Sequence, residues 1–176
     1  MNRLSILLFA LVLVSCGSLK TTVDYDKSVD FGKYKTYGFS AEANQLPVND
    51  LVRKRILNAI HSALQSKGLK EAEKPNLLVD LGVKTEEKQQ TSANSVNMGG
   101  FYGRRWGFGT GFSTTQVNTT NYTEGTLVIN LVDAAKQELV WMGSGTATVT
   151  EKSIQQDKIE AAVTKILAKF PPAPKK

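Results

Sequence analysis

The sequence predicts an α+β domain built as a two-layer α/β sandwich, with a largely antiparallel sheet of about five or six strands and two amphipathic helices. Two kinds of periodicity predict it. Residues 76–85 place apolar side chains at every second position, as a half-buried strand does, and 126–133 with 138–149 have the pattern of an antiparallel hairpin around a turn. Residues 50–67 and the segment after Ser153 repeat apolar side chains at the spacing of a helix. Elements with one apolar face bury those faces against each other, which predicts two layers.

The first two strands are expected at residues 23–26 and 34–39. Both segments are rich in aromatic and β-branched residues, and a polar turn containing Asp30 and Gly32 separates them. Residues 16–22 precede the first strand and are expected to form a short tether. The domain therefore begins with a pair of short strands.

The first helix is expected over residues 50–67. Asn49 is a suitable N-cap, because its side chain can accept a hydrogen bond from a free backbone N–H of the first turn. Gly68 followed by Leu69 fits a left-handed C-terminal cap with an apolar contact. The apolar stripe of this helix consists of Val52, Ile56, Ile60, Ala63 and Leu64.

The middle of the chain is predicted as a strand at 76–85, a flexible loop over about 86–120, and a hairpin made of 126–133 and 138–149. The loop prediction depends on the polar composition after residue 85 and on the glycine content further on. The returning strand of the hairpin is expected to present one face made of Leu139, Trp141, Gly143, Gly145, Ala147 and Val149. Its glycines leave room for a helix to lie close to the sheet.

The last helix is predicted to open at Ser153, because Gln156 three residues later completes the pattern of a capping box. Pro171 ends the helix, and residues 173–176 form a basic tail. No internal repeat or linker divides the chain between these elements. Residues 23–172 are therefore expected to form a single globular domain.

Residues 1–15 have the pattern of a cleavable signal peptide. Arg3 supplies a positive start, and the apolar run 4–14 is too short to span a bilayer. The run ends in Leu13-Val14-Ser15-Cys16, which resembles the bacterial lipobox. Cys16 is the only cysteine of the chain, so it has no internal disulfide partner. The sequence predicts that Cys16 becomes the lipid-modified N-terminus of the mature protein.

The expected location is the outer membrane, with the protein anchored by its lipid and facing the periplasm. Gly17 and Ser18 follow the cysteine, so the aspartate that often retains lipoproteins in the inner membrane is absent from these positions. The inner membrane and the cell surface remain open alternatives. The chain has 22 basic and 16 acidic residues. This basic charge could favour anionic envelope components, although its wide spread fits simple solubility, and nucleic acid is not an expected partner of an exported protein.

A resemblance to a known family covers residues 23–172. The segments that carry it are Val23-Asp24-Tyr25-Asp26, Phe31, Tyr34-Lys35-Thr36-Tyr37, Tyr122 with Glu124-Gly125-Thr126-Leu127-Val128-Ile129, Leu131-Val132-Asp133, Leu139-Val140-Trp141, Gly143 and Phe170-Pro171-Pro172. In this order and spacing they resemble the bacterial lipoprotein family called domain of unknown function 4136. Met142 stands where that family usually has arginine. The resemblance implies an exported, membrane-anchored α/β domain and implies no reaction.

Residues suited to catalysis are scarce. His61 is the only histidine, one position off the first helix's stripe, and is interpreted as a surface or boundary residue. Without further histidine or a free cysteine, no zinc site, other metal site or cofactor is expected. Asp24, Asp26 and Asp30 could form a carboxylate or calcium site, but support of the first strand is the preferred interpretation. We therefore expect a protein that is not an enzyme, with a carboxylate-based hydrolase as a remote alternative.

The segment 99–112 is the strongest candidate for an interaction site. Its glycines alternate with aromatic and arginine side chains, which give large contact area and stacking. The candidate residues are Phe101, Tyr102, Arg104, Arg105, Trp106 and Phe108. An envelope protein, a glycan or lipid headgroups could be the partner, unless these aromatics fold back onto the sheet. The predicted function is a non-enzymatic binding or assembly module, and the alternative is a lipoprotein that binds a small lipid or glycan ligand.

Overall fold

The computed structural model describes residues 19–96 and 114–172 of the chain. Its centre is a six-stranded sheet with the order β1-β6-β5-β4-β2-β3. The strands are β1 Lys20–Tyr25, β2 Thr36–Phe39, β3 Lys70–Glu71, β4 Leu77–Val96, β5 Thr114–Asp133 and β6 Glu138–Thr148. The helices are α1 Asp50–Ser66 and α2 Gln156–Ile166, with short 3-10 helices η1 Phe31–Lys33, η2 Glu42–Gln45 and η3 Leu167–Lys169. The predicted α+β sandwich is confirmed.

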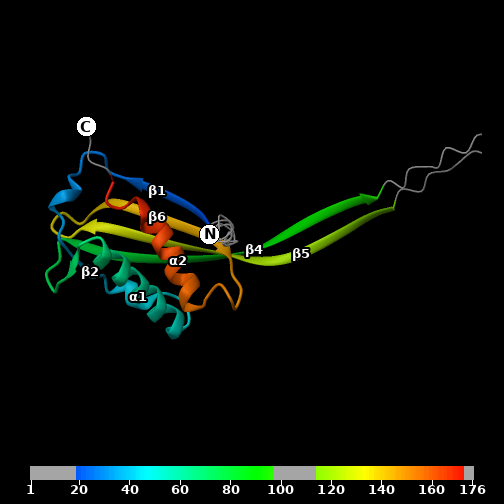
Figure 1. The fold of residues 1–176 in the computed structure, drawn as a ribbon, viewed down its shortest axis with the longest axis horizontal. Coiled ribbons are helices and arrows are strands. Elements are labelled where there is room, and N and C mark those ends of the chain that lie inside the picture. Colours follow the sequence, from blue (N-terminus) through cyan, green and yellow to red (C-terminus); the bar gives the residue numbers. More distant parts are fainter. Residues whose placement is uncertain (1–18, 97–113, 173–176) are drawn as a thin grey trace, which may run out of the picture.

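Helices α1 and α2 lie on one face of the sheet, and neither of them covers the opposite face (Figure 1). Strands β1, β6, β5 and β4 pair antiparallel, whereas β2 pairs parallel with β4 and with β3. The parallel pairing follows from α1, because the chain leaves β2, crosses over through this helix and returns in the same direction. The sheet is therefore mixed and largely antiparallel, as expected.

The core lies between the sheet and the two helices. Its largest fully buried side chains include Trp141 from β6, Tyr37 from β2, Phe170 after η3, and Ile60 and Leu64 from α1. These residues come from widely separated parts of the chain. One continuous core therefore joins both helices to the sheet, as in a single domain.

Helix α2 packs against the small residues of β6. A Cβ atom added to Gly143 would lie 2.8 Å from the Cγ2 atom of Ile166, and one added to Gly145 would lie 2.7 Å from its Cδ1 atom. The expectation that these glycines make room for a helix is confirmed.

Both predicted caps of α1 are present. The Asn49 side chain accepts a hydrogen bond from the Leu51 N–H at 2.8 Å. Gly68 adopts φ 86°, and the N–H groups of Gly68 and Leu69 donate to the carbonyls of Gln65 and Leu64. This pair of bonds is the Schellman motif, in which a left-handed glycine reverses the chain. Local sequence therefore determines both ends of α1.

The loop predicted over 86–120 was wrong for the parts that the structure describes. Strand β4 continues to Val96 and β5 begins at Thr114, and the two pair without a break from Leu77↔Asp133 to Val96↔Thr114. The composition is polar because these parts of the strands lie beyond the helices (Figure 1), and residues 86–91 and 119–121 are exposed. The segment 97–113 lies outside the described residues.

Two boundary predictions and one prediction of a strand face also need correction. Strand β1 begins at Lys20, inside the predicted tether, because residues 20–25 pair with β6. Helix α2 begins at Gln156 rather than at Ser153, whose side chain and N–H bond with Thr150 in the preceding turn, so no capping box forms. A bulge beside Val132 puts Leu139 on the other face from Trp141, and Leu139 is 53% exposed.

Candidate functional site

A two-stranded arm projects from the body of the molecule. Strand β6 ends opposite Glu124, and β2 leaves β4 at Val79. Beyond these points the outer parts of β4 and β5, residues 87–96 and 114–123, pair only with each other (Figure 1). Ten residues at roughly 3.4 Å each give the arm a length of about 34 Å.

The base of the arm carries a cluster of charges on the helix-free face of the sheet. Lys88 Nζ lies 2.7 Å from Glu124 Oε2 and 3.7 Å from Glu86 Oε2, and Lys84 contacts Glu86. The hydrogen bond from Lys84 and the charge of Lys88 hold the pKa of Glu86 below its usual value. The hydrogen bond to Glu124 raises the pKa of Lys88. The Lys88–Glu124 pair joins β4 to β5 and helps to hold the two strands in register.

The predicted interaction residues lie outside the described residues. Phe101, Tyr102, Arg104, Arg105, Trp106 and Phe108 all belong to the segment that connects β4 to β5. Cys16 also lies outside the described residues. The structure describes the arm, which ends where this connecting segment begins. The contacts predicted for the segment stay predictions.

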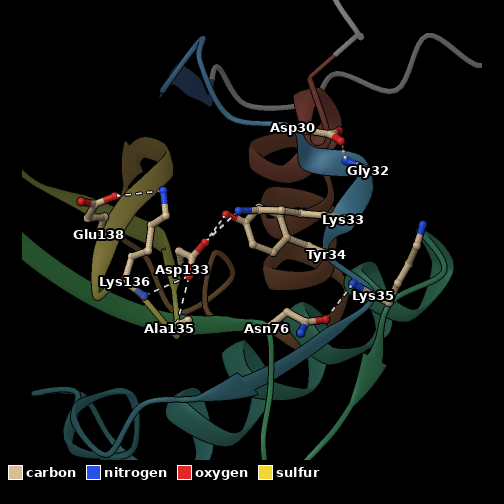
Figure 2. Close-up of polar contacts among 10 residues, drawn as sticks. All are labelled: Asp30, Gly32, Lys33, Tyr34, Lys35, Asn76, Asp133, Ala135, Lys136 and Glu138. Atoms are coloured by element: carbon tan, nitrogen blue, oxygen red, sulfur yellow. Dashed lines mark hydrogen bonds and ion pairs between the residues drawn. The ribbon is translucent and has the colours of Figure 1, made fainter.

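Asp133, at the end of β5, is a buried polar site that the sequence interpretation missed. Its Oδ2 atom accepts hydrogen bonds from Tyr34 Oη at 2.8 Å and Lys33 Nζ at 3.0 Å (Figure 2). Its Oδ1 atom accepts from the N–H groups of Ala135 and Lys136. These bonds hold the pKa of the Asp133 carboxyl far below its usual range, with the Tyr34 hydroxyl as the largest cause.

The hydrogen bonds of Asp133 join two segments that are far apart in the sequence. Lys33 and Tyr34 belong to η1 and its C-cap, whereas Asp133 begins the turn between β5 and β6. The Lys33 ammonium also lies 4.7 Å from the centroid of the Tyr34 ring. All the acceptor positions of the carboxylate are used by groups of the protein itself. We therefore assign Asp133 a structural role in this fold.

His61 takes part in a second polar group. Its Nδ1 atom lies 2.8 Å from Tyr37 Oη and 3.1 Å from Glu71 Oε2. Burial raises the pKa of Tyr37 to about 12, and the charge of Glu71 acts in the same direction. His61 is half-buried at the edge of α1, as its predicted boundary position implies. The buried hydroxyl of Tyr37 thereby gains a hydrogen-bond partner, which is a sufficient structural reason for this histidine.

Each of the three N-terminal carboxylates accepts hydrogen bonds from a residue one or two positions later in the chain. Asp24 accepts from the Tyr25 N–H at 2.9 Å, Asp26 accepts from the Ser28 N–H and hydroxyl at 2.7 Å, and Asp30 accepts from the Gly32 N–H at 2.8 Å. The last bond caps η1. This geometry agrees with the preferred structural interpretation. Within residues 19–96 and 114–172, no group of three His, Cys, Asp or Glu side chains is arranged to hold a metal ion.

The fold and the arm together define a class of protein, namely an α+β sandwich with helices on one face only and a projecting β-hairpin. The chain belongs to the family described as domain of unknown function (DUF4136), whose model matches residues 21–172. This confirms the resemblance stated above. No curated protein matches the chain.

Two kinds of solved structure share the fold. A PDZ domain protein from Parabacteroides distasonis matches with a TM-score of 0.54 and 19% identity, over 88% of this chain and 35% of that one. This chain therefore spans about a third of that protein. The PelC dodecamer from Paraburkholderia phytofirmans, in a crystal of space group P6, matches with a TM-score of 0.50 and 11% identity, over 86% of this chain and 96% of that one. At these identities the likeness concerns the fold alone.

Proposed function

We propose that the mature chain is a lipid-anchored protein of the cell envelope that acts as a non-enzymatic binding or assembly module, with the arm as its contact element. The observation that carries this proposal is the projection of β4 and β5 beyond the rest of the sheet. An unsupported hairpin adds little to the core of its own protein, because two strands alone bury little apolar surface. Such a hairpin is suited to reach a neighbouring molecule.

The composition of the connecting segment supports the same role. Aromatic and arginine side chains dominate the energetics of many protein interfaces, and six of them occur between residues 101 and 108. The PelC structure supports an assembly role by analogy, because that protein is a dodecamer with a similar fold. By this proposal the arm of one chain contacts an envelope partner or a further copy of the same chain.

The anchor is proposed at Cys16, which places the domain on the periplasmic side of the outer membrane. Replacing this residue, Cys16→Ser, removes the only thiol that can accept a diacylglycerol. We expect the variant to lose incorporation of a labelled fatty acid and to leave the outer-membrane fraction, because stable anchoring needs two or more acyl chains. A variant that keeps the label and the location would contradict the anchor.

The interaction site is tested by capture of partners from solubilised envelopes. A five-serine variant replaces Phe101, Tyr102, Arg104, Arg105 and Trp106. We expect the wild-type protein to retain one or more envelope partners, or copies of itself carrying a second tag, and the five-serine variant to lose them.

A matched control replaces Leu51 and Lys54, an exposed apolar residue and an exposed cation on α1. This double-serine variant should capture the same partners as the wild type. Equal capture by the wild-type and five-serine proteins would refute the proposed site. So would equal losses in the five-serine variant and the control.

A further inference from the structure

An open groove of about 600 Å³ lies where the loop after β1 meets the C-terminal end of the described chain. Its lining includes Tyr25 and Phe31 from the chain around the loop after β1, and Phe170, Pro171 and Pro172 from the chain after η3. The volume falls within the range of pockets that hold small ligands. This groove lies in the body of the molecule and shares no residue with the arm.

Aromatic rings line the groove in a series that starts in the core. Trp141 and Phe170 lie 5.5 Å apart between ring centroids, Phe170 and Phe31 lie 6.0 Å apart, and Phe31 and Tyr25 lie 6.1 Å apart. Exposure rises along the series, from 0% for Trp141 to 38% for Tyr25. The inner rings hold the outer ones in position. The groove thus presents a supported apolar surface that is open to solvent.

Three lysines also line the groove, namely Lys27, Lys35 and Lys67. None of them forms an ion pair among the residues that the structure describes. Figure 2 shows Lys35 extending away from the Asp133 site. The Asp26 and Asp30 carboxylates in the same lining accept hydrogen bonds from their own turns. The cations are therefore available to a ligand, whereas these two acidic groups are engaged within their loop.

We propose that this groove binds an amphipathic anion, with an apolar body against the aromatic and proline walls and one carboxylate or phosphate head beside the lysines. The apolar body makes the binding free energy more favourable, because it covers rings that would otherwise contact water. The anionic head adds a favourable electrostatic contribution, because the three lysines form no ion pair within the described residues. A neutral amphiphile gains only the first of these contributions, so the groove discriminates by charge.

The test uses the mature, lipidated protein in nanodiscs of zwitterionic lipid and follows binding of decanoate by calorimetry, with empty nanodiscs as the blank. We expect saturable binding of decanoate and at least roughly ten-fold weaker binding of decanamide, which corresponds to about 1.4 kcal/mol. Lys27, Lys35 and Lys67 are exposed or half-buried at the surface, so their replacement by glutamine should leave the fold intact. This triple variant should bind decanoate as weakly as the wild type binds decanamide.

A matched triple variant replaces Lys54, Lys74 and Lys152, which are exposed lysines outside the groove. It should bind decanoate as the wild type does. The variant Tyr25→Ala should weaken decanoate and decanamide alike, because the ring contributes to the apolar contact only. Equal affinity for decanoate and decanamide would overturn the proposal, and so would equal affinity in the two triple variants.

The source of the anion is resolved by changing the nanodisc lipid. If phosphatidylglycerol in the nanodisc competes with decanoate in the wild type and not in the groove variant, the groove takes its anion from membrane lipid. If it does not compete, the groove takes a free anion. Both results support the binding site. The five-serine variant of the connecting segment should bind decanoate normally, so the outcome of this test is independent of the proposed function.

Discussion

Replacing Gly143 by alanine should lower the free energy of unfolding by about 2 to 3 kcal/mol, within the usual cost of overpacking a core. The added Cβ atom would lie 2.3 Å from the Trp141 ring and 2.8 Å from Ile166. Neither group has free space, because both side chains are almost fully buried. The strain therefore has to be relieved by moving both the Trp141 ring on β6 and the helix α2 that carries Ile166. Chemical denaturation of the wild type and the variant measures the difference.

Gly82→Ala is the matched control for this prediction. A Cβ atom at Gly82 would meet only Val128, at an ordinary contact distance of 3.7 Å. The control should therefore be neutral or slightly stabilising, because alanine restricts the unfolded chain more than glycine does. In a Trp141→Phe background, which lacks the ring atoms that clash, Gly143→Ala should cost less. A cost independent of residue 141 would contradict the packing described for this face.

Asp133→Asn is expected to lower the free energy of unfolding by about 2 to 3 kcal/mol, since hydrogen bonds to a charged group are lost at a buried position. The amide keeps an oxygen for the N–H groups of the turn but presents a donor toward the Tyr34 hydroxyl and the Lys33 ammonium. Glu138→Gln is the matched control. This residue lies in the same hairpin with an exposed side chain, and its replacement should have little effect.

The Asp133 prediction also has a definite dependence on pH. Because the pKa of the folded state is lowered from the ordinary value of 3.8, the carboxylate contributes its full stability above that pH. The contribution declines as the pH falls below 3.8 toward the lower pKa of the folded state. The difference between wild type and Asp133→Asn should therefore shrink in acid. A difference that stays constant from neutral pH to pH 2 would contradict the assigned ionisation.

Local sequence predicted the elements whose signals are local. The first helix was predicted almost to the residue, because Asn49 and Gly68 mark its ends through bonds within a few positions. The hairpin of β5 and β6 was predicted because two strand-like segments flank a short turn at residues 133–137. The capping box at Ser153 failed because the same residue types can bond to Thr150 in a turn. Sequence pattern alone does not decide between these two partners.

The arm was missed for a different reason. Outside the core a strand has no buried face, so its sequence loses the alternation by which strands are recognised. The arm is held by its backbone, because the N–H and C=O groups of β4 pair with those of β5. The bulge beside Val132 was missed as well, since one extra residue in a strand leaves no signal in composition.

The sites depend on contacts between distant segments and had no sequence signal of their own. Asp133 meets Tyr34 across 99 positions of the chain. The lysines of the groove come from three separate segments, around Lys27, Lys35 and Lys67. Only the aromatic and arginine residues of 99–112 were recognisable in advance, because they lie together in the sequence. Tertiary structure is needed to find sites whose residues come from distant segments of the chain.

Site-specific photo-crosslinking in intact envelopes tests the central claim most directly. A photoreactive residue is placed at Gln90 or Thr119, exposed positions on the two strands of the arm, and as a control at Ser62, an exposed position on α1. The proposed function predicts discrete crosslinked species from both arm positions, few from Ser62, and their loss in the five-serine variant. Equal crosslinking from Ser62 and the arm, or none from the arm in envelopes where the protein is present, would contradict it.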